Sequence, residues 1–122
     1  MSRAVGYVRE TVEGVPNRTD QEEAVGALAR SQGLDLTRVW SDDSTADEIA
    51  DRPGLAEALD ALEPGMTLLI YDLGSLATDL LAQELYLRDV RAKGASVVAC
   101  SPDDAEYLGD DAHSLASGLD LP

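Results

Sequence analysis

Four short apolar runs, separated by segments with helix signals, most constrain the fold of this chain. They occupy residues 4–9, 36–40, 67–72 and 95–101 and contain many β-branched or aromatic side chains. Runs of this length and composition are typical of strands. The third run is apolar without a break over LLIY, as in a strand that is buried on both faces. The pattern predicts an α/β fold.

Helix signals lie between these runs. Thr19 and Glu22 have the spacing of a capping box, in which two side chains satisfy free amides at a helix start, so we expect a first helix up to Gln32 that Gly33 ends. DRPGLAEALDAL (51–62) predicts a second helix with a proline near its first turn. Residues 76–93 predict a third helix. Its core-facing stripe should comprise Leu76, Leu80, Leu87 and Val90, widened by Leu81 and Leu85 and interrupted by Gln83.

Strands that alternate with helices form a parallel sheet with helices on both faces. We therefore expect a three-layer sandwich of flavodoxin-like topology, with a mostly parallel sheet of four strands, or five if the final segment adds one. In such folds the functional edge is the carboxyl end of the strands. The residues expected at that edge are Arg9, Glu10, Thr11, Asp42, Asp43, Asp72 and Ser101.

Length and composition predict one globular domain over residues 1–122. The chain has 122 residues, of which 44% are apolar, enough for an ordinary core. It contains no apolar run of membrane-spanning length, and its start, MSRAVGYVRE, lacks the apolar centre of a secretory signal, so we expect a cytoplasmic protein without membrane association.

The single cysteine and the single histidine give no sign of a disulfide or a metal site. Cys100 lies in an apolar run and is typical of a buried thiol. His113 has no second His or Cys at the spacing of metal ligands, so we expect no metal there.

The charge balance opposes unaided binding to nucleic acids. The chain has 24 acidic and 9 basic residues and a formal net charge of −15. Affinity for DNA and RNA comes largely from cations that neutralise phosphates. The acids gather in SDDSTADE (41–48) and DDAEYLGDD (103–111), the second within an acidic C-terminal segment, 102–122. Both clusters are typical of a solvated, solubilising surface.

Two site types agree poorly with the residues that follow the strands. The first strand leads into RETVEGVPN, which lacks the glycine spacing of a phosphate-binding loop, so we expect no nucleotide, flavin or other cofactor. LLIYDL resembles the third strand of two-component receiver domains, which would make Asp72 a phosphoacceptor that needs magnesium. Such domains hold the metal with acids after the first strand, where this chain has Arg9 and Glu10. Asp42 and Asp43 still provide acids at the same edge, so a receiver-like phosphoacceptor at Asp72 remains an alternative.

Three separated stretches carry a more extensive resemblance. GYVRET (6–11), DRPGLAEAL (51–59) and LLIYDLGSLATDLL (68–81) resemble, in order and spacing, the N-terminal catalytic domain of the serine recombinases, the resolvase and invertase family. The resemblance extends from Arg3 to Ser101. It implies a resolvase-like fold and a reaction in which a serine hydroxyl attacks a DNA phosphodiester while arginines hold the phosphoryl charge. By resemblance the catalytic positions are Arg9, Thr11, Arg52 and Asp72.

The chain departs from the family pattern at positions that matter for catalysis. Leu73 and Leu76 stand where the family has two arginines, and Thr11 stands in place of the serine. Ala46-Asp47 replaces a flexible Ser-Gly and adds negative charge where DNA should pass. The family's long dimerising helix and separate DNA-binding domain have no counterpart in this sequence.

These departures favour a pseudoenzyme that acts through contacts with a protein partner, or a vestige of a mobile element. Loss of one arginine that stabilises a phosphoryl-transfer transition state costs about 10³ to 10⁵ in rate, or roughly 4–7 kcal/mol. Asp72 would then remain as a structural acceptor, either ion-paired to Arg9 or Arg52 or capping backbone amides. An alternative is a recombinase or nuclease component that a DNA-binding partner completes. A weak homodimer through another face also remains open.

Overall fold

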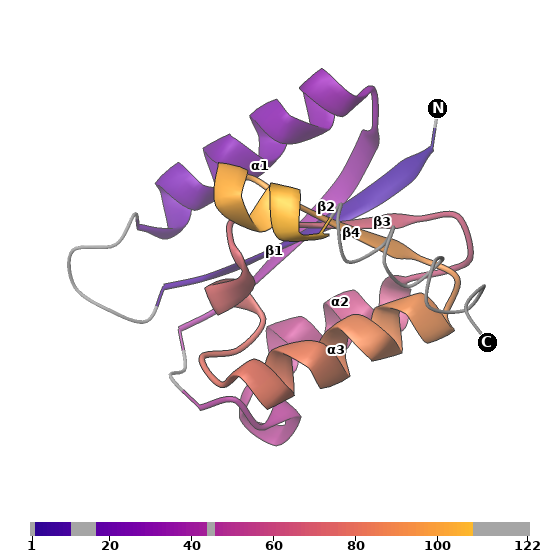
Figure 1. Ribbon diagram of the computed structural model, residues 1–122. Helices are drawn as coiled ribbons and strands as arrows, with labels where there is room; N and C mark the ends of the chain where they lie inside the picture. Colours follow the sequence, from indigo (N-terminus) through magenta and orange to yellow (C-terminus); the bar gives the residue numbers. More distant parts are fainter. Residues whose placement is uncertain (1, 11–16, 44–45, 109–122) are drawn as a thin grey trace.

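The computed structural model describes residues 2–10, 17–43 and 46–108 (Figure 1). Strands and helices alternate along the chain. Two short 3₁₀ turns are also present: η1 lies just before α2, and η2 lies just after β3. The elements are β1 (Arg3–Arg9), α1 (Arg18–Gln32), β2 (Asp35–Asp42), η1 (Ile49–Asp51), α2 (Pro53–Ala61), β3 (Thr67–Ile70), η2 (Leu73–Ser75), α3 (Leu80–Ala92) and β4 (Ser96–Ala99). Residues 102–108 are also helical.

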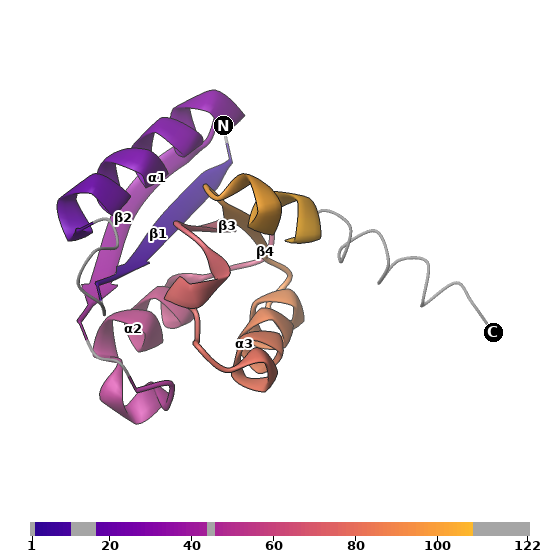
Figure 2. The same cartoon turned by 60° about the vertical axis from the view of Figure 1, so that its left-hand side comes forward.

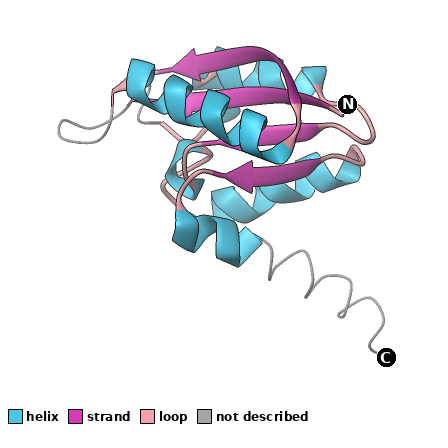
Figure 3. Cartoon of the chain, turned by 90° about the horizontal axis from the view of Figure 1, so that it is seen from above, coloured by secondary structure: helices cyan, strands magenta, loops and turns pink. Residues whose placement is uncertain are grey.

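The strands form one parallel sheet in the order β2-β1-β3-β4. Figure 3 shows the strands side by side and running in one direction. This order confirms the predicted flavodoxin-like α/β topology, because β1 lies between β2 and β3. Within the described residues the sheet has four strands. Since all strands are parallel, their carboxyl ends meet at one edge.

Helices cover both faces of the sheet, with α1 on one face and α2 and α3 on the other (Figure 1). Side chains alternate accordingly along the strands. Val5 and Tyr7 of β1 pack in the core beneath α2 and α3, whereas Ala4 and Val8 pack with Val25 of α1. Two apolar cores therefore lie on opposite faces of the sheet and hold the three predicted layers together.

The first helix begins earlier than predicted. Its N-cap is Asn17, whose Oδ1 accepts a hydrogen bond from the amide of Asp20 at 2.8 Å. The predicted cap at Thr19 was wrong because asparagine is an equally good cap and, two residues earlier, adds half a turn to the helix. The predicted end was right: Gly33 has a φ of 66°, and its amide contacts the carbonyl oxygens of Ala29 and Arg30.

The segment after β3 differs most from the prediction. The strand ends at Ile70, a 3₁₀ turn occupies Leu73–Ser75, and α3 starts at Leu80, where Asp79 caps the amide of Ala82 at 3.0 Å. We predicted the strand to residue 72 and the helix from residue 76. Two successive caps cause the difference, because each carboxylate satisfies amides in a non-helical conformation and interrupts a continuous helix.

The predicted apolar stripe of the third helix was correspondingly wrong. Leu87 and Val90 are buried, and Leu76 is buried before the helix begins. Leu80, Leu81 and Leu85 are instead 68%, 67% and 47% exposed. At 3.6 residues per turn, Leu81 and Leu85 lie roughly opposite the face that carries Leu87 and Val90. The sequence pattern had combined leucines from the η2 turn with leucines from both sides of α3.

The remaining boundaries differ by a few residues. The second strand extends over Asp35–Asp42 rather than 36–40, and the second helix is Pro53–Ala61 rather than 51–62, with the short turn η1 before it. The fourth strand is shorter than predicted, Ser96–Ala99. No helix in the described ranges is both long enough and apolar enough to cross a membrane.

Candidate functional site

The carboxyl edge of the sheet brings Arg9, Arg52 and the turn after Asp72 together. Arg9 is the last residue of β1 and lies opposite Asp42 of β2 in the register. Both arginines donate to carbonyl oxygens of the 73–76 segment: Arg9 to Gly74, and Arg52 to Leu76. Thr11, the position of the nucleophile in the family resemblance, lies outside the described residues.

The guanidinium group of Arg9 is held inside the protein. Its side chain is 1% exposed, and it donates to the carbonyl oxygens of Ala46 at 3.1 Å and Gly74 at 2.9 Å. Its ion pair is with Asp47, at 3.4 Å. Burial, and then the nearby charge of Arg52, lower the pKa of Arg9. Its terminal nitrogens thus all contact acceptors of this chain.

Arg52 is completely buried. Its terminal nitrogens donate to the carbonyl oxygens of Leu76 and Ser75 and, at 3.1 Å, to the hydroxyl of Tyr7. The Tyr7 hydroxyl in turn donates to Asp42 Oδ2 at 2.7 Å. Burial raises the pKa of Tyr7, which keeps the phenol protonated. The chain Asp42–Tyr7–Arg52 therefore connects a buried cation to a carboxylate through a neutral hydroxyl.

Asp42 also holds the start of α2. Its two carboxylate oxygens accept hydrogen bonds from the amides of Gly54 and Leu55, both at 2.9 Å. These amides are among the free donors of the first helical turn, where a carboxylate is favourable. This acid, expected at the functional edge, is therefore engaged in binding β2 to α2.

Asp47 is the residue whose role the sequence analysis missed. Its carboxylate accepts from Arg9, from the amides of Thr78 and Asp79 at 2.9 and 3.0 Å, and from the Thr78 hydroxyl at 2.9 Å. Burial acts to raise the pKa of Asp47, but the hydrogen bonds from Thr78 and Asp79 outweigh it and lower the pKa. The only sequence signal was an acid in a loop near a cation-bearing edge.

Asp72 has one of the two structural roles expected for it. Its Oδ1 accepts from the amide of Ser75 at 3.0 Å and from the Ser75 hydroxyl at 3.2 Å, which makes a capping box over η2. The ion pair of Arg9 is formed with Asp47 rather than Asp72. Leu73 and Leu76, which the resemblance aligned with two family arginines, are 8% and 0% exposed and pack in the core.

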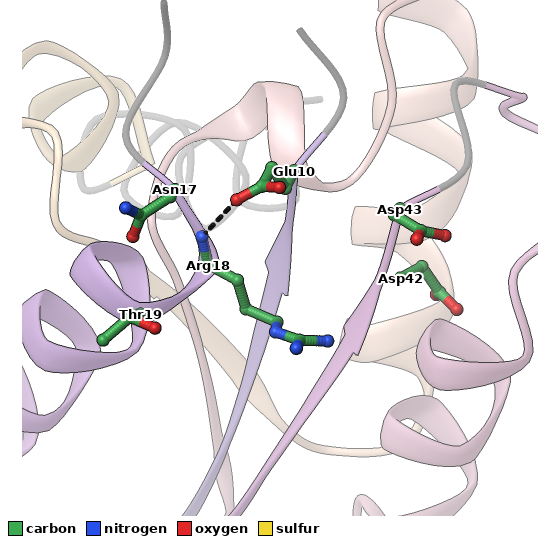
Figure 4. A pocket seen from close by; sticks show the side chains of 6 residues that line it. All are labelled: Glu10, Asn17, Arg18, Thr19, Asp42 and Asp43. Atoms are coloured by element: carbon green, nitrogen blue, oxygen red, sulfur yellow. Dashed lines mark hydrogen bonds between the residues drawn. The ribbon is translucent and has the colours of Figure 1, made fainter. Parts of the chain in front are cut away.

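A polar pocket of roughly 340 Å³ lies beside this edge (Figure 4). It is lined by three carboxylates, one guanidinium and two neutral polar side chains: Glu10, Asp42, Asp43, Arg18, Asn17 and Thr19. Glu10 already accepts a hydrogen bond from the amide of Arg18 at 2.6 Å. With acids in excess, the pocket disfavours an anionic ligand such as a phosphate.

The described residues contain no group of three or more His, Cys, Asp or Glu side chains placed to hold a metal ion. Among the residues that the structure describes, the buried Nε atoms of Arg9 and Arg52 at this edge have no hydrogen-bond partner. At Arg9 and Arg52, the arginines that the resemblance assigns to catalysis, acceptors of the chain itself therefore occupy most of the donor atoms.

Comparisons with known proteins agree with this architecture. The N-terminal catalytic domain of TP901-1 integrase superposes with a TM-score of 0.70 at 14% identity, covering 98% of this chain and 100% of that one. The C-terminal catalytic domain of ISC1926 TnpA, an IS607-like serine recombinase, gives 0.64 at 18% identity, covering 96% and 82%. A resolvase family site-specific recombinase from Streptococcus pneumoniae gives 0.62 at 12% identity, covering 98% and 91%.

At these identities the structural likeness establishes a shared fold. A search of curated proteins found no significant match. The sequence evidence for a family comes from the model of the resolvase N-terminal domain, which matches residues 4–117. That match spans nearly the whole chain and confirms the resemblance inferred from the three sequence stretches. The chain belongs to the family of resolvase N-terminal domains, with the fold of serine-recombinase catalytic domains.

Proposed function

We propose that this resolvase-type domain does not cleave or rejoin DNA by itself and that it acts through contacts with other proteins. The observation that carries the proposal is the state of the two remaining arginines. Arg9 and Arg52 are both buried, and their terminal nitrogens donate to oxygens of the chain itself. A phosphodiester would have to displace these acceptors before either cation could stabilise it.

The local charges support the same conclusion. Asp47 supplies an internal carboxylate to Arg9, where a catalyst would need an unpaired cation. Leu73 and Leu76, at the positions of two family arginines, are core residues and supply no charge. Because phosphoryl transfer depends mainly on fixed positive charge around the transition state, a site with these features should not turn over.

The direct test is exposure of the purified protein to supercoiled plasmid, followed by denaturing gels with and without protease digestion. We expect no nicked circles and no DNA that migrates with covalently attached protein. An active serine recombinase, run in parallel on its own site, shows that the assay detects both products. The Thr11→Ala variant is the matched control, since it lacks the hydroxyl that the resemblance identifies with the nucleophile.

A covalent protein–DNA product that disappears in the Thr11→Ala variant would overturn the proposal. A covalent product that persists in that variant would come from a contaminating enzyme such as a topoisomerase or from another nucleophile of this chain, and a mock preparation from cells that do not express this chain distinguishes the two. Under the proposal, wild type and variant give the same blank result.

A second candidate is a recombination component that a partner completes, and one observation favours it. The Nε atoms of Arg9 and Arg52 have no hydrogen-bond partner within the described part of the chain, so each guanidinium retains one unused donor there. The test mixes this chain with a serine recombinase that binds its DNA site but is inactive because alanine replaces its nucleophile. Cleavage that requires Thr11 of this chain supports the second candidate, whereas continued absence of cleavage supports the first.

A further inference from the structure

The exposed apolar side chains of this protein concentrate around one helix. Among the described residues, the exposed large apolar side chains are Ile49, Leu80, Leu81, Leu85 and Tyr107. Three of them are on α3, and the Tyr107 hydroxyl donates to Glu84 of the same helix at 2.7 Å. Single exposed leucines are common on protein surfaces, but a cluster of exposed leucines on one helix indicates a contact surface.

Part of this cluster lines a groove, which we name the α2–α3 groove. It has a volume of about 460 Å³ and is lined by residues of η1, α2 and α3 and of the segment before η1. Figure 2 shows α2 and α3 on the side of the sheet opposite α1. Its lining combines four aliphatic side chains, one tyrosine and three carboxylates: Ile49, Leu59, Ala82, Leu85, Tyr86, Asp47, Glu48 and Asp89. Ile49 and Leu85 are the exposed large aliphatic residues in the lining, at 42% and 47%.

Two contacts hold the walls of the groove in place. The Tyr86 hydroxyl of α3 donates to the carbonyl oxygen of Asp47, just before η1. The Lys93 ammonium, at the end of α3, donates to the carbonyl oxygen of Leu59 in α2. Asp47 is itself fixed by Arg9 and the Thr78 amide. A groove that is already formed costs little conformational entropy when a ligand enters it.

The charge of the groove indicates the chemistry of its ligand. Its lining residues include three carboxylates and no lysine, arginine or histidine. Asp47 is paired with Arg9, but Glu48 and Asp89 are exposed. A second copy of this chain would bring another net charge of −15 to an acidic rim. Charge complementarity therefore favours a basic partner over self-association.

We propose that the α2–α3 groove binds an amphipathic helix of a partner protein, with large aliphatic side chains toward Ile49 and Leu85 and lysine or arginine side chains toward Glu48 and Asp89. Helices that dock in grooves use such anchors at positions i, i+3, i+4 and i+7. The 13 residues of α3 span about 20 Å, the length of a partner helix of about four turns. This inference rests on the proposed role in protein contacts and gives that role a surface.

The test uses two synthetic helical peptides of about 14 residues with the same leucine face. One carries lysines on its other faces, and the other carries glutamates. Binding to the full chain is measured by fluorescence anisotropy at about 0.15 M salt, where distant charges are screened. We expect the lysine peptide to bind, the glutamate peptide not to bind, and amide NMR shifts to change along η1 and α3.

Variants separate the groove from the general negative charge. The combined change Ile49→Ser and Leu85→Ser should weaken binding of the lysine peptide by about tenfold or more, as for loss of central apolar anchors. Leu80→Ser is the matched control, because Leu80 is on the same helix, is 68% exposed and does not line the groove. Glu48→Lys with Asp89→Lys should also weaken binding, whereas Glu23→Lys on α1 should not. All these positions are exposed, so the variants should fold.

Three outcomes of the peptide experiment would overturn this inference. They are equal binding of both peptides, equal effects of Leu80→Ser and the groove variants, and failure of the lysine peptide to bind at all. A concentration-dependent dimer that the groove variants abolish would also overturn it, since the occupant would then be a second copy. If the peptide-binding experiment fails, the result of the plasmid cleavage assay still stands. DNA cleavage by this chain, in contrast, would contradict the proposed function whether or not the lysine peptide binds.

Discussion

At the scale of single residues, Arg9 and Arg52 donate to acceptors of the chain itself. A buried guanidinium is costly unless acceptors surround it. Here the acceptors are carbonyl oxygens of the 73–76 segment, the Tyr7 hydroxyl and the Asp47 carboxylate. These two cations thus stabilise the turn after β3.

Asp47 provides the first prediction at this scale. The Asp47→Asn change removes the charge that pairs with Arg9 and weakens the acceptor for Thr78. We expect a loss of about 1–3 kcal/mol in the free energy of unfolding near neutral pH, the usual effect of a broken charged hydrogen bond. Urea unfolding measures it. Asp43→Asn, a nearby change at an exposed acid, is the control and should have an effect within about 0.5 kcal/mol.

The pH dependence of the same variant is the second prediction. The pKa of Asp47 is lowered by folding, so its contribution is present above the unfolded value of 3.8 and is lost as the pH falls through the folded value. Between about pH 6 and pH 2.5, wild type should lose more stability than Asp47→Asn. Parallel loss in both proteins would show that Asp47 makes no such contribution.

At the scale of elements, α2 is bound to β2 by close backbone contact. A Cβ atom at Gly54 would lie 2.5 Å from the carbonyl oxygen of Ser41 and 3.0 Å from the Asp42 carboxylate. The same position also donates its amide to Asp42. The absence of a side chain at Gly54 lets the carboxylate of one element reach the first turn of the next.

The third prediction follows from this contact. Gly54→Ala should destabilise the fold by about 1–3 kcal/mol, because backbone must shift to admit the methyl group. Gly26→Ala is the matched control: it lies within α1, its nearest neighbour is the flexible end of Arg30 at 3.6 Å, and alanine favours a helix interior by roughly 0.5–1 kcal/mol. Thermal unfolding of the two variants should therefore move in opposite directions.

The η2 turn gives the fourth prediction. Asp72→Ala removes the side-chain acceptor for the Ser75 amide and should cost about 1 kcal/mol, the usual effect of a lost cap. Asp103→Ala removes an exposed acid in the helical residues 102–108 and is the control for the change in net charge. A loss several times larger than a cap can explain would argue against a purely local role for Asp72.

At the scale of the whole molecule, the net charge of −15 governs long-range behaviour. Like charges over the surface repel one another and destabilise the compact state, and salt screens this repulsion. They also repel nucleic acids, which carry a dense negative charge of their own.

The fifth prediction tests both consequences. The midpoint of thermal unfolding should rise by a few degrees as sodium chloride is raised from about 20 mM to about 0.5 M. A labelled DNA duplex should show no change in anisotropy with the protein at about 50 mM salt, where nonspecific binding is strongest. Saturable DNA binding at low salt would reveal a basic surface that the overall charge conceals.

Sequence patterns alone determined the architecture. The alternation of apolar runs and helix signals predicted the parallel sheet, and Gly33 predicted the end of α1, because hydrophobic periodicity and backbone conformation are local properties. The three stretches at 6–11, 51–59 and 68–81 likewise identified the family, and the predicted strand ends put Arg9 and Asp72 at one sheet edge.

Only the tertiary structure decided which groups meet and which face water. The ion pair of Arg9 with Asp47 joins residues 38 positions apart, and no local pattern selects it over Asp72. The helical repeat places Leu81 and Leu85 roughly opposite Leu87 and Val90, and only the tertiary structure showed which of these two faces is buried. Leu73 and Leu76 are buried before α3 begins, whereas Leu85 on the outer side of α3 stays exposed and lines the α2–α3 groove.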